Sequence, residues 1–202
     1  MFKILTKIPN DIGLAFSGGV DSLAIAHFLK MGKKNVTLYH FNHMDEYSPE
    51  IEYKCCHLAD LLHMKIVVDS FSGDIPKGRS IEDVWRRARY RFLRSRDQKI
   101  ITGHHLDDAV ETWVWSSLHG EGKLIPVESS NIIRPFLTTE KQTFINYCKN
   151  NNLDPVEDEC NKDLSLMRNY MRANMMEHLY KINPGLKTVI RKKYQPLKES
   201  LK

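Results

Sequence analysis

The sequence has no long hydrophobic run, and this absence argues against a chain that crosses a membrane as a helix. None of its apolar stretches approaches the ~18 residues needed to span a bilayer. Residues 1–7 also lack the apolar segment and the small-residue cleavage site of a secretory signal. We therefore expect a soluble, cytoplasmic protein with no membrane partner.

Cysteine is scarce as well, with four residues in a chain of 202. Cys55 and Cys56 are adjacent and unlikely to pair with each other, and the sequence contains no Cys-x-x-Cys spacing. This density excludes a disulfide scaffold and favours reduced thiols that pack in the interior.

The excess of basic over acidic residues is confined to the second part of the chain. Residues 1–80 carry nine Lys/Arg and nine Asp/Glu, whereas residues 81–202 carry 21 and 16, which accounts for the whole net charge of +5. Six arginines lie between Arg86 and Arg96, and the tail from Lys181 holds seven basic residues against one acid, Glu199. Such clusters suit a polyanion. By charge alone, a solvated helix face explains them equally well.

Strand-like and helix-like segments alternate from residue 12 to residue 151. Short apolar or β-branched runs predict strands at 12–16, 36–41, 65–68, 99–102 and 131–134. Helical periodicity predicts helices at 21–31, 49–63, 81–96, 106–118 and 139–151, and residues 119–130 read as a loop. The alternation predicts an α/β fold, a five-stranded parallel sheet with helices on both faces in a Rossmann-like arrangement.

The character of the sequence changes after residue 152. Residues 153–163 are irregular and acidic, residues 164–180 have helical periodicity, and residues 186–202 form a short basic helix or a tail. We predict a main domain at 1–152 and a small helical, basic C-terminal appendage at 153–202 that packs on it.

The first candidate site is a glycine-containing turn between the first strand and the first helix. It reads Ser17-Gly18-Gly19-Val20-Asp21-Ser22. Glycines let the backbone approach a phosphate closely, and the following helix offers unpaired N–H groups. Asp21 is a candidate ligand for a Mg²⁺ ion that bridges phosphate oxygens. The loop lacks the Gly-Lys-Ser/Thr of a Walker motif and the G-x-G-x-x-G of a dinucleotide fingerprint. The alternative is an ordinary turn, which needs neither the serines nor the aspartate.

A second polar cluster follows the fourth predicted strand. It reads Gly103-His104-His105-Leu106-Asp107-Asp108-Ala109-Val110-Glu111-Thr112. On a helix, His104 and Asp108 share a face, as do Asp107 and Glu111. Acids at a helix N-terminus also favour the helix dipole, so a structural role stays open. Zinc is one candidate ligand, but hard carboxylates near a phosphate loop favour Mg²⁺.

These segments together resemble a known family. Residues 17–22 resemble the SGGxDS signature of the PP-loop (N-type) ATP pyrophosphatases, which cleave ATP to AMP and pyrophosphate. Residues 103–112 resemble the GHHxDDxxET motif of the tRNA(Ile)-lysidine synthetases, a subgroup of that superfamily. Residues 39–43, 82–92, 133–137 and 157–172 resemble, in order, further motifs of that subgroup. The match covers residues 12–175.

The resemblance implies a two-step ligation that uses ATP and Mg²⁺. ATP would adenylate the C2 carbonyl oxygen of the wobble cytidine in tRNA(Ile) with a CAU anticodon, releasing pyrophosphate. The ε-amine of L-lysine would then attack C2 and displace AMP, giving lysidine.

The resemblance also implies roles for individual residues. The residues expected to bind the nucleotide are Ser17, Gly18, Gly19, Val20, Asp21, Ser22, Phe41 and His43. The catalytic candidates are Asp21, His104, Asp108 and Arg134, with Asp21 and Asp108 as metal ligands. Substrate RNA or phosphate would meet Arg86, Arg89, Asp107, Glu111, Arg168 and Arg172.

The chain departs from the family pattern at several points. It stops where the family usually continues into further tRNA-contacting domains, His119 stands where arginine is common, and Cys160 replaces the usual serine. An adenylating PP-loop enzyme with another acceptor, such as a tRNA thiolase or an amide-forming ligase, therefore stays an alternative, as does a module that only binds nucleotide or RNA.

Overall fold

A computed structural model describes residues 1–156, 163–164 and 166–196. The strands are β1 (Asp11–Ala15), β2 (Asn35–Asn42), β3 (Lys65–Ser70), β4 (Ile100–Ile101), β5 (Glu128–Ser129) and β6 (Ile132–Ile133). The helices of the main α/β unit are α1 (Val20–Met31), α2 (Ser48–Leu61), α3 (Ile81–Arg94), α4 (Leu106–Leu118) and α5 (Lys141–Asn150). Three short helices follow, α6 (Met167–Asn174), α7 (Met176–Ile182) and α8 (Leu186–Lys193). No helix in the described part of the chain is long and apolar enough to span a bilayer.

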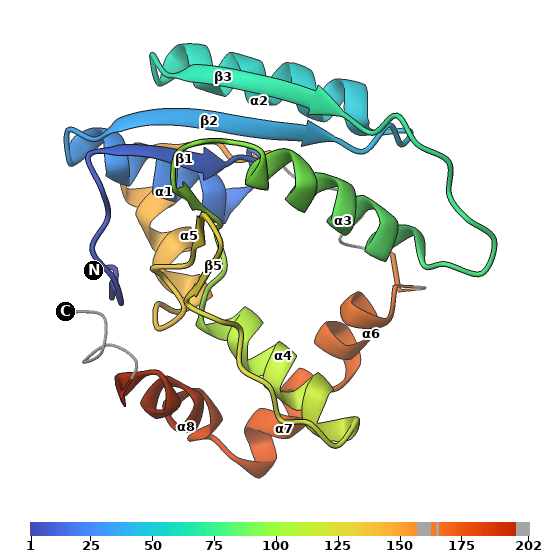
Figure 1. The fold of residues 1–202 in the computed structure, drawn as a ribbon. Helices are drawn as coiled ribbons and strands as arrows, with labels where there is room; N and C mark the ends of the chain where they lie inside the picture. The colour runs from blue at the N-terminus through green and yellow to red at the C-terminus, as the bar shows by residue number, and fades with distance from the viewer. Residues whose placement is uncertain (157–162, 165, 197–202) are drawn as a thin grey trace.

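The strands form one sheet in the order β3-β2-β1-β4-β6-β5 (Figure 1). The chain builds outward from β1 through β2 to β3, then returns to the other side of β1 to form β4. β1 pairs in parallel with both β2 and β4. Strand order therefore reverses between β1 and β4, and in open α/β sheets ligands bind at such a switch point, beyond the carboxyl ends of the strands.

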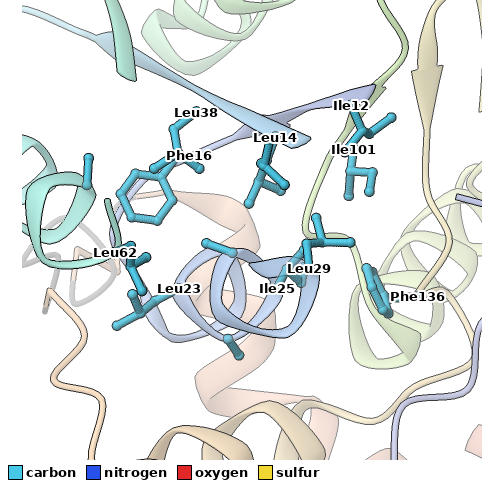
Figure 2. Close-up of a cluster of buried hydrophobic side chains, with 14 of the residues drawn as sticks. Ile12, Leu14, Phe16, Leu23, Ile25, Leu29, Leu38, Leu62, Ile101 and Phe136 are labelled. Carbon is cyan, nitrogen blue, oxygen red and sulfur yellow. The ribbon is translucent and has the colours of Figure 1, made fainter. Parts of the chain in front are cut away.

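Alternation of side chains along the strands builds a core on each face of the sheet. Ile12, Leu14, Leu38, Ile101 and Ile133 pack with α1, α2 and α5 on one face. Figure 2 shows part of this cluster, with Leu23, Ile25 and Leu29 of α1 directed at the strands. Their neighbours in sequence, including Tyr39, Phe41, Ile100 and Ile132, pack with Phe92 and Leu93 of α3 on the opposite face.

Close packing on this second face requires glycine at position 13. A Cβ at Gly13 would lie 2.8 Å from the ring of Tyr39 and 2.9 Å from Ile100, closer than side-chain carbons approach.

The C-terminal helices complete a third cluster around α4. Leu106, Ala109, Val110 and Val114 of α4 pack with Met171, Met176, Leu186, Ile190 and Tyr194. Tyr194 is fully buried, and its hydroxyl donates to the carbonyl of Ile125 over 2.9 Å. Residues 166–196 thus contribute directly to the hydrophobic packing of α4, and Figure 1 shows α7 and α8 beneath it.

The α/β class and the helices on both faces are confirmed, but the prediction of a five-stranded, wholly parallel sheet is wrong. Within the stretch expected to be a loop, β5 pairs antiparallel with β6 and adds a sixth strand. A two-residue turn joins them, with Ser130 in the left-handed region at φ 59°. With two residues, β5 is too short to show alternation in the sequence.

The single helix predicted for residues 164–180 is also corrected, because the chain bends at Met175. Met175 has φ −110°, away from the helical value of about −63°, whereas its ψ of −39° is helical. The bend lets α6 face the polar residues of α4 while Met176 of α7 enters the apolar cluster.

Candidate functional site

A cleft of about 460 Å³ opens beyond the carboxyl ends of β1, β2 and β4. Residues predicted from two separate motifs meet in it, since Ser17, Asp21 and Ser22 line the cleft together with His104 and Asp108. Phe41, His43 and Arg89 add walls from β2 and α3, and Arg168 and Arg172 add a wall from α6. The sequence-based expectation that the two motifs share one cleft is therefore met.

The loop at residues 17–22 forms a compact turn at the N-terminus of α1. Gly18 has φ +72°, and a Cβ there would lie 2.7 Å from Val156 and 3.0 Å from the sulfur of Cys55. Ser22 Oγ donates to the carbonyl of Gly19 and lies 3.3 Å from Ser17 Oγ. Gly19 caps α1 with its backbone and no side-chain bond. The first N–H groups of α1, which have no intrahelical acceptor, therefore keep their capacity to bind an anion.

Asp21 lies in the first turn of α1 with its two carboxylate oxygens in different situations. Oδ2 accepts from the ammonium of Lys141 at 2.7 Å. Oδ1 is buried and has no hydrogen-bond partner among the described residues, and the nearest histidine nitrogen, His105 Nε2, lies 3.7 Å away. A buried carboxylate oxygen without a donor is costly unless a cation or a ligand group completes it.

The two histidines of the second motif are held in different ways. His104 Nδ1 bonds the hydroxyl of Thr102 at 2.9 Å, and burial, reinforced by Arg134 and Arg168, lowers the pKa of His104 to about 3. His104 is therefore neutral at physiological pH. His105 caps α4, where its Nδ1 accepts from the backbone N–H of Asp108. That bond leaves the proton on Nε2, the nitrogen that faces Asp21.

Asp108 is saturated with donors, in contrast to Asp21. Its Oδ2 accepts from the N–H of His105 at 2.9 Å and its Oδ1 from the guanidinium of Arg168 at 3.1 Å. Burial alone would raise the pKa of Asp108, but His105, His104 and Arg168 hold it below its usual value. Asp108 is therefore a fixed negative charge with both oxygens committed.

Glu111 lies beneath α6 and does not line the cleft. It is buried, and it accepts from Arg172 at 2.7 and 2.8 Å and from Arg168 at 3.2 Å. The hydrogen bonds to Glu111 raise the pKa of Arg172. A bidentate pair of this kind fixes the direction of a guanidinium, so Glu111 holds α6 against α4 and aims two arginines at the cleft.

Aromatic side chains form the opposite wall. The ring of His43 lies 5.2 Å from that of Trp85 at an angle of 31°, and 5.4 Å from Phe41. Burial and the nearby Arg89 lower the pKa of His43 to about 4, so this ring is neutral. Its buried Nδ1 has no partner among the described residues. This wall offers flat surfaces and one unused ring nitrogen, which suits a heteroaromatic base.

Arg89 brings positive charge into the cleft from α3. No carboxylate lies within salt-bridge distance of it among the described residues, and its guanidinium lies over the ring of Tyr90, 6.0 Å from the centroid. Burial, together with Arg168, lowers its pKa. Figure 1 shows α3 and α6 approaching each other, which brings Arg89 and Arg168 to the same side of the cleft.

Seven of the predicted site residues lie outside the lining of the cleft, and for four of them, Arg86, Asp107, Glu111 and Arg134, the side chain is engaged elsewhere. Arg86 pairs with Asp83 at 2.6 Å on the outer side of α3, and Glu111 has the buried position described above. Asp107 accepts from the backbone N–H of Lys141 at 2.8 Å and pairs with Lys187 at 2.5 Å. Arg134 is 5% exposed and donates to the carbonyl of Pro126 and to the hydroxyl of Tyr90. Gly18, Gly19 and Val20 contribute backbone rather than lining side chains.

The sequence reasoning missed three residues of the site. Lys141 begins α5, and it reaches Asp21 because α5 packs along α1. His105 belongs to the second motif but was given no role, and Trp85, which lines the cleft, was not named as a site residue. A cap position before Asp107 and Asp108 signals His105. Lys141 and Trp85 have no sequence signal, because their roles depend on helix packing.

The donor set fits a magnesium ion only if phosphate oxygens complete it. Within the described ranges, no group of three His, Cys, Asp or Glu residues could hold a metal ion. Asp21 nevertheless keeps one buried oxygen without a partner beside the N-terminus of α1. Mg²⁺ is commonly held by one or two carboxylates, water and substrate phosphates. Asp21 fits that pattern, whereas both oxygens of Asp108 are occupied.

One predicted motif cannot be placed. Residues 157–162, which include Cys160, lie outside the described residues, so only the end of the last family segment is seen, at Arg168 and Arg172.

Comparison with known proteins agrees with this geometry. The profile of the PP-loop domain matches residues 3–179. The chain is 31% identical to a tRNA(Ile)-lysidine synthase of Petrotoga mobilis, over 92% of this chain and 65% of that protein. It is 28% identical to one from Vibrio campbellii, over 90% of this chain and 46% of that protein. The chain thus spans about half to two thirds of these relatives.

Among solved structures, the NH3-dependent NAD synthetase from Campylobacter jejuni matches with a TM-score of 0.52 and 14% sequence identity. The match covers 94% of this chain and 86% of that chain. At this level of identity the likeness concerns the fold, and it supports the topology described above.

Proposed function

Because the chain belongs to the PP-loop family, we propose that it uses ATP to adenylate a tRNA and joins an amine to the activated base. The specific reaction proposed is lysidine formation. ATP adenylates the C2 carbonyl oxygen of the wobble cytidine of a tRNA(Ile) with a CAU anticodon, and L-lysine then displaces AMP. The match to the PP-loop domain and the tRNA(Ile)-lysidine synthases named above support this choice.

One observation carries the proposal. Asp21 Oδ1, which has no hydrogen-bond partner among the described residues, lies in the same cleft as the open N-terminus of α1 and the guanidinium of Arg89, which no described carboxylate pairs with. A cation site and an anion site side by side are what a magnesium–triphosphate group requires. An ordinary strand-to-helix turn has no need of a buried, unsatisfied carboxylate.

ATP is proposed to lie across the switch point of the sheet. Its pyrophosphate end would meet the N–H groups of α1 and the hydroxyls of Ser17 and Ser22. Its adenine would lie against Phe41 and His43, where the buried Nδ1 of neutral His43 accepts a hydrogen bond from an exocyclic amine. Asp21 would hold Mg²⁺ together with phosphate oxygens, and the ion would neutralise charge on the departing pyrophosphate.

The first step exchanges one P–O bond for another. The C2 carbonyl oxygen of cytidine attacks the α-phosphorus of ATP, and the bond between that phosphorus and the bridging oxygen of pyrophosphate breaks. Negative charge develops on non-bridging oxygens, and Arg89, Arg168 and Arg172 line the cleft as donors to them. Neutral His104 can donate a hydrogen bond there without adding charge.

The second step forms a C–N bond. Lysine enters as the ammonium and loses one proton to solvent. Its ε-amine then attacks C2, the C–O bond to AMP breaks, and the nitrogen loses a second proton to solvent. The carboxylates of Asp21 and Asp108 make the cleft attractive to the incoming ammonium form. Glu111 is proposed to act as a positioning residue, because it touches Arg168 and Arg172 rather than the cleft.

The thiols in the described residues do not favour sulfur transfer as the second step. Cys55 is buried, and burial raises the pKa of its thiol to about 12. Burial also raises the pKa of Cys148 to about 11. A thiol with so high a pKa supplies little thiolate nucleophile near neutral pH.

The decisive experiment uses α-labelled ATP, labelled lysine and a tRNA(Ile) transcript with a CAU anticodon. We expect AMP release that depends on lysine, together with lysine entering the tRNA. A transcript with a CAC anticodon is the matched control and should stay unmodified. AMP release that is unaffected by lysine would assign the protein another acceptor, and the absence of AMP with every acceptor would refute adenylation.

A further inference from the structure

A second cavity, of about 750 Å³, lies on the outer side of α3, away from the cleft. It is bounded by the second half of α3 and by the chain that carries β5 and β6. Its lining consists of Arg86, Arg87, Tyr90, Arg91, Arg94, Ser95, Pro126, Ser129 and Arg134. Five of these nine residues are arginines, and no carboxylate is among them. Tyr90 lines both cavities, so it separates this cavity from the cleft.

The charge of this cavity is only partly compensated. Asp83 pairs with Arg86 and with Arg87, each at 2.6 Å. Arg91 and Arg94 are exposed, and neither has a carboxylate within 4 Å in the described part of the chain. Arg94 instead lies over the ring of Tyr90, at 5.4 Å. Two guanidiniums thus keep their donors free at the mouth of the cavity.

Arg134 supplies a second, independent observation at the bottom of the cavity. It is 5% exposed, and its terminal nitrogens donate to Pro126 and Tyr90, which are both uncharged partners. Its Nε is buried without an acceptor, and no carboxylate pairs with it among the described residues. A buried cation without a counter-charge is expensive, and native proteins normally pair it with an anion.

We propose that this second cavity binds a backbone phosphate of the RNA substrate. Planar guanidinium forks match phosphate oxygens, and the hydroxyl of Tyr90, whose oxygen accepts from Arg134, adds a donor. Arg87, Arg91 and Arg94 follow one another at helical spacing along the same face of α3. A stripe of charge along a helix suits successive phosphates of a strand better than a single small ion.

The position of the second cavity indicates how a phosphate bound there would assist the reaction. A strand anchored on the outer side of α3 would have to pass over Tyr90 to deliver a base into the cleft. Phosphate contacts fix the register of a nucleic acid without reading its sequence. The cavity would therefore hold the nucleotides that flank the target base. In naming RNA as the ligand, this inference rests on the proposed function.

The test removes two exposed arginines and compares the result with a matched loss of charge elsewhere. The variant Arg91→Ala/Arg94→Ala is compared with Lys65→Ala/Lys149→Ala, in which two exposed lysines outside both cavities are replaced. Binding of the labelled tRNA transcript is measured between about 50 and 200 mM salt, where counterion release dominates affinity. ATP binding is measured in parallel without RNA.

We expect the arginine variant to bind tRNA about tenfold or more weakly, with a salt slope reduced by about two, while the lysine variant changes little. ATP binding should stay unchanged in both. Equal tRNA affinity in the two variants would overturn the proposal. Inorganic phosphate is the second arm. If it binds at millimolar concentration and loses that binding in the arginine variant, while tRNA affinity is unchanged, the cavity would belong to a free anion.

The outcomes also separate this inference from the proposed function. Weakened tRNA binding in the arginine variant, with no AMP formed by the unmodified protein, would support the second cavity and refute the ligase. Normal lysidine formation by the unmodified protein, with equal tRNA binding by both variants, would support the ligase and refute the second cavity.

Discussion

The N-termini of α1 and α4 follow neighbouring strands and face one cleft. The aspartates that they carry nevertheless differ in how many hydrogen-bond donors their carboxylate oxygens meet. Asp21 at the start of α1 keeps one buried oxygen without a donor, and its other oxygen meets a single lysine. Asp108 at the start of α4 has both oxygens occupied, by the backbone of His105 and by Arg168.

The difference indicates a division of labour between two acidic positions that look alike in the sequence. An incompletely satisfied carboxylate has capacity for an incoming cation, whereas a saturated one serves to orient its partners. We therefore expect α1 to engage the magnesium–phosphate end of ATP. We expect α4 to act through the arginines that it holds, and the following predictions test this contrast.

The largest effect should come from Asp21→Asn. The substitution keeps the shape of the side chain but removes the charge that would hold Mg²⁺. Formation of AMP should fall by about 10³-fold or more, in line with the loss of a principal electrostatic contact in an active site. The measurement is single-turnover AMP release, with circular dichroism and thermal melting as controls for folding. A variant that turns over at a tenth of the original rate would remove Asp21 from the metal site.

A smaller, structural effect is expected on the α4 side from Glu111→Gln. The neutral amide cannot compensate Arg168 and Arg172, but both guanidiniums are nearly half exposed and can be hydrated. We expect a loss of about 1 to 3 kcal/mol in the free energy of unfolding, at or below the lower end for a broken buried ion pair. Urea titration measures it, and AMP release should also fall.

The exposed pair Glu177–Lys181 provides the control, because Glu177→Gln should change the unfolding free energy by less than about 1 kcal/mol. Equal losses for Glu111→Gln and Glu177→Gln would contradict the positioning role of Glu111.

The sequence predicts that the two aspartates lie close together, but it does not predict which of them keeps an oxygen without a donor. The motifs at 17–22 and 103–112 predict that Asp21 and Asp108 meet, because parallel strands end at one edge of a sheet. The partners that distinguish the two aspartates come from α5 and α6. The direction of α6 depends on the bend at Met175, and the reach of Lys141 depends on the packing of α5 on α1. Neither is encoded by local periodicity.

The pH dependence of the free energy of unfolding tests whether the fold keeps the two histidines of the cleft neutral. Burial lowers the pKa of His104 to about 3 and of His43 to about 4, whereas the unfolded chain protonates near 6.5. The unfolded state therefore binds more protons between these values, and stability falls as the pH drops below 6.5. The slope is at most about 1.4 kcal/mol per pH unit for each histidine.

Urea unfolding at pH 7, 6 and 5 checks this expectation, and His43→Asn should flatten the curve. The exposed His63, which has a positive φ that asparagine tolerates, provides the control variant His63→Asn. An identical pH dependence in both variants would show that His43 is not held neutral by the fold.

The smallest effect should come from Lys141→Met, which removes the ammonium that donates to Asp21. The two side chains are 39% and 24% exposed, so their ion pair contributes at most about 1 kcal/mol to stability. Yet the ammonium lies 2.7 Å from Asp21 Oδ2 and competes with any cation for that carboxylate. We therefore expect the Mg²⁺ concentration for half-maximal AMP release to fall by about two- to fivefold, since a competing charge is removed. If the Lys141→Met variant instead needs a higher Mg²⁺ concentration for half-maximal AMP release, Lys141 assists the binding of the metal or the phosphates. The ammonium and the metal would then act together at Asp21 and would not compete for it.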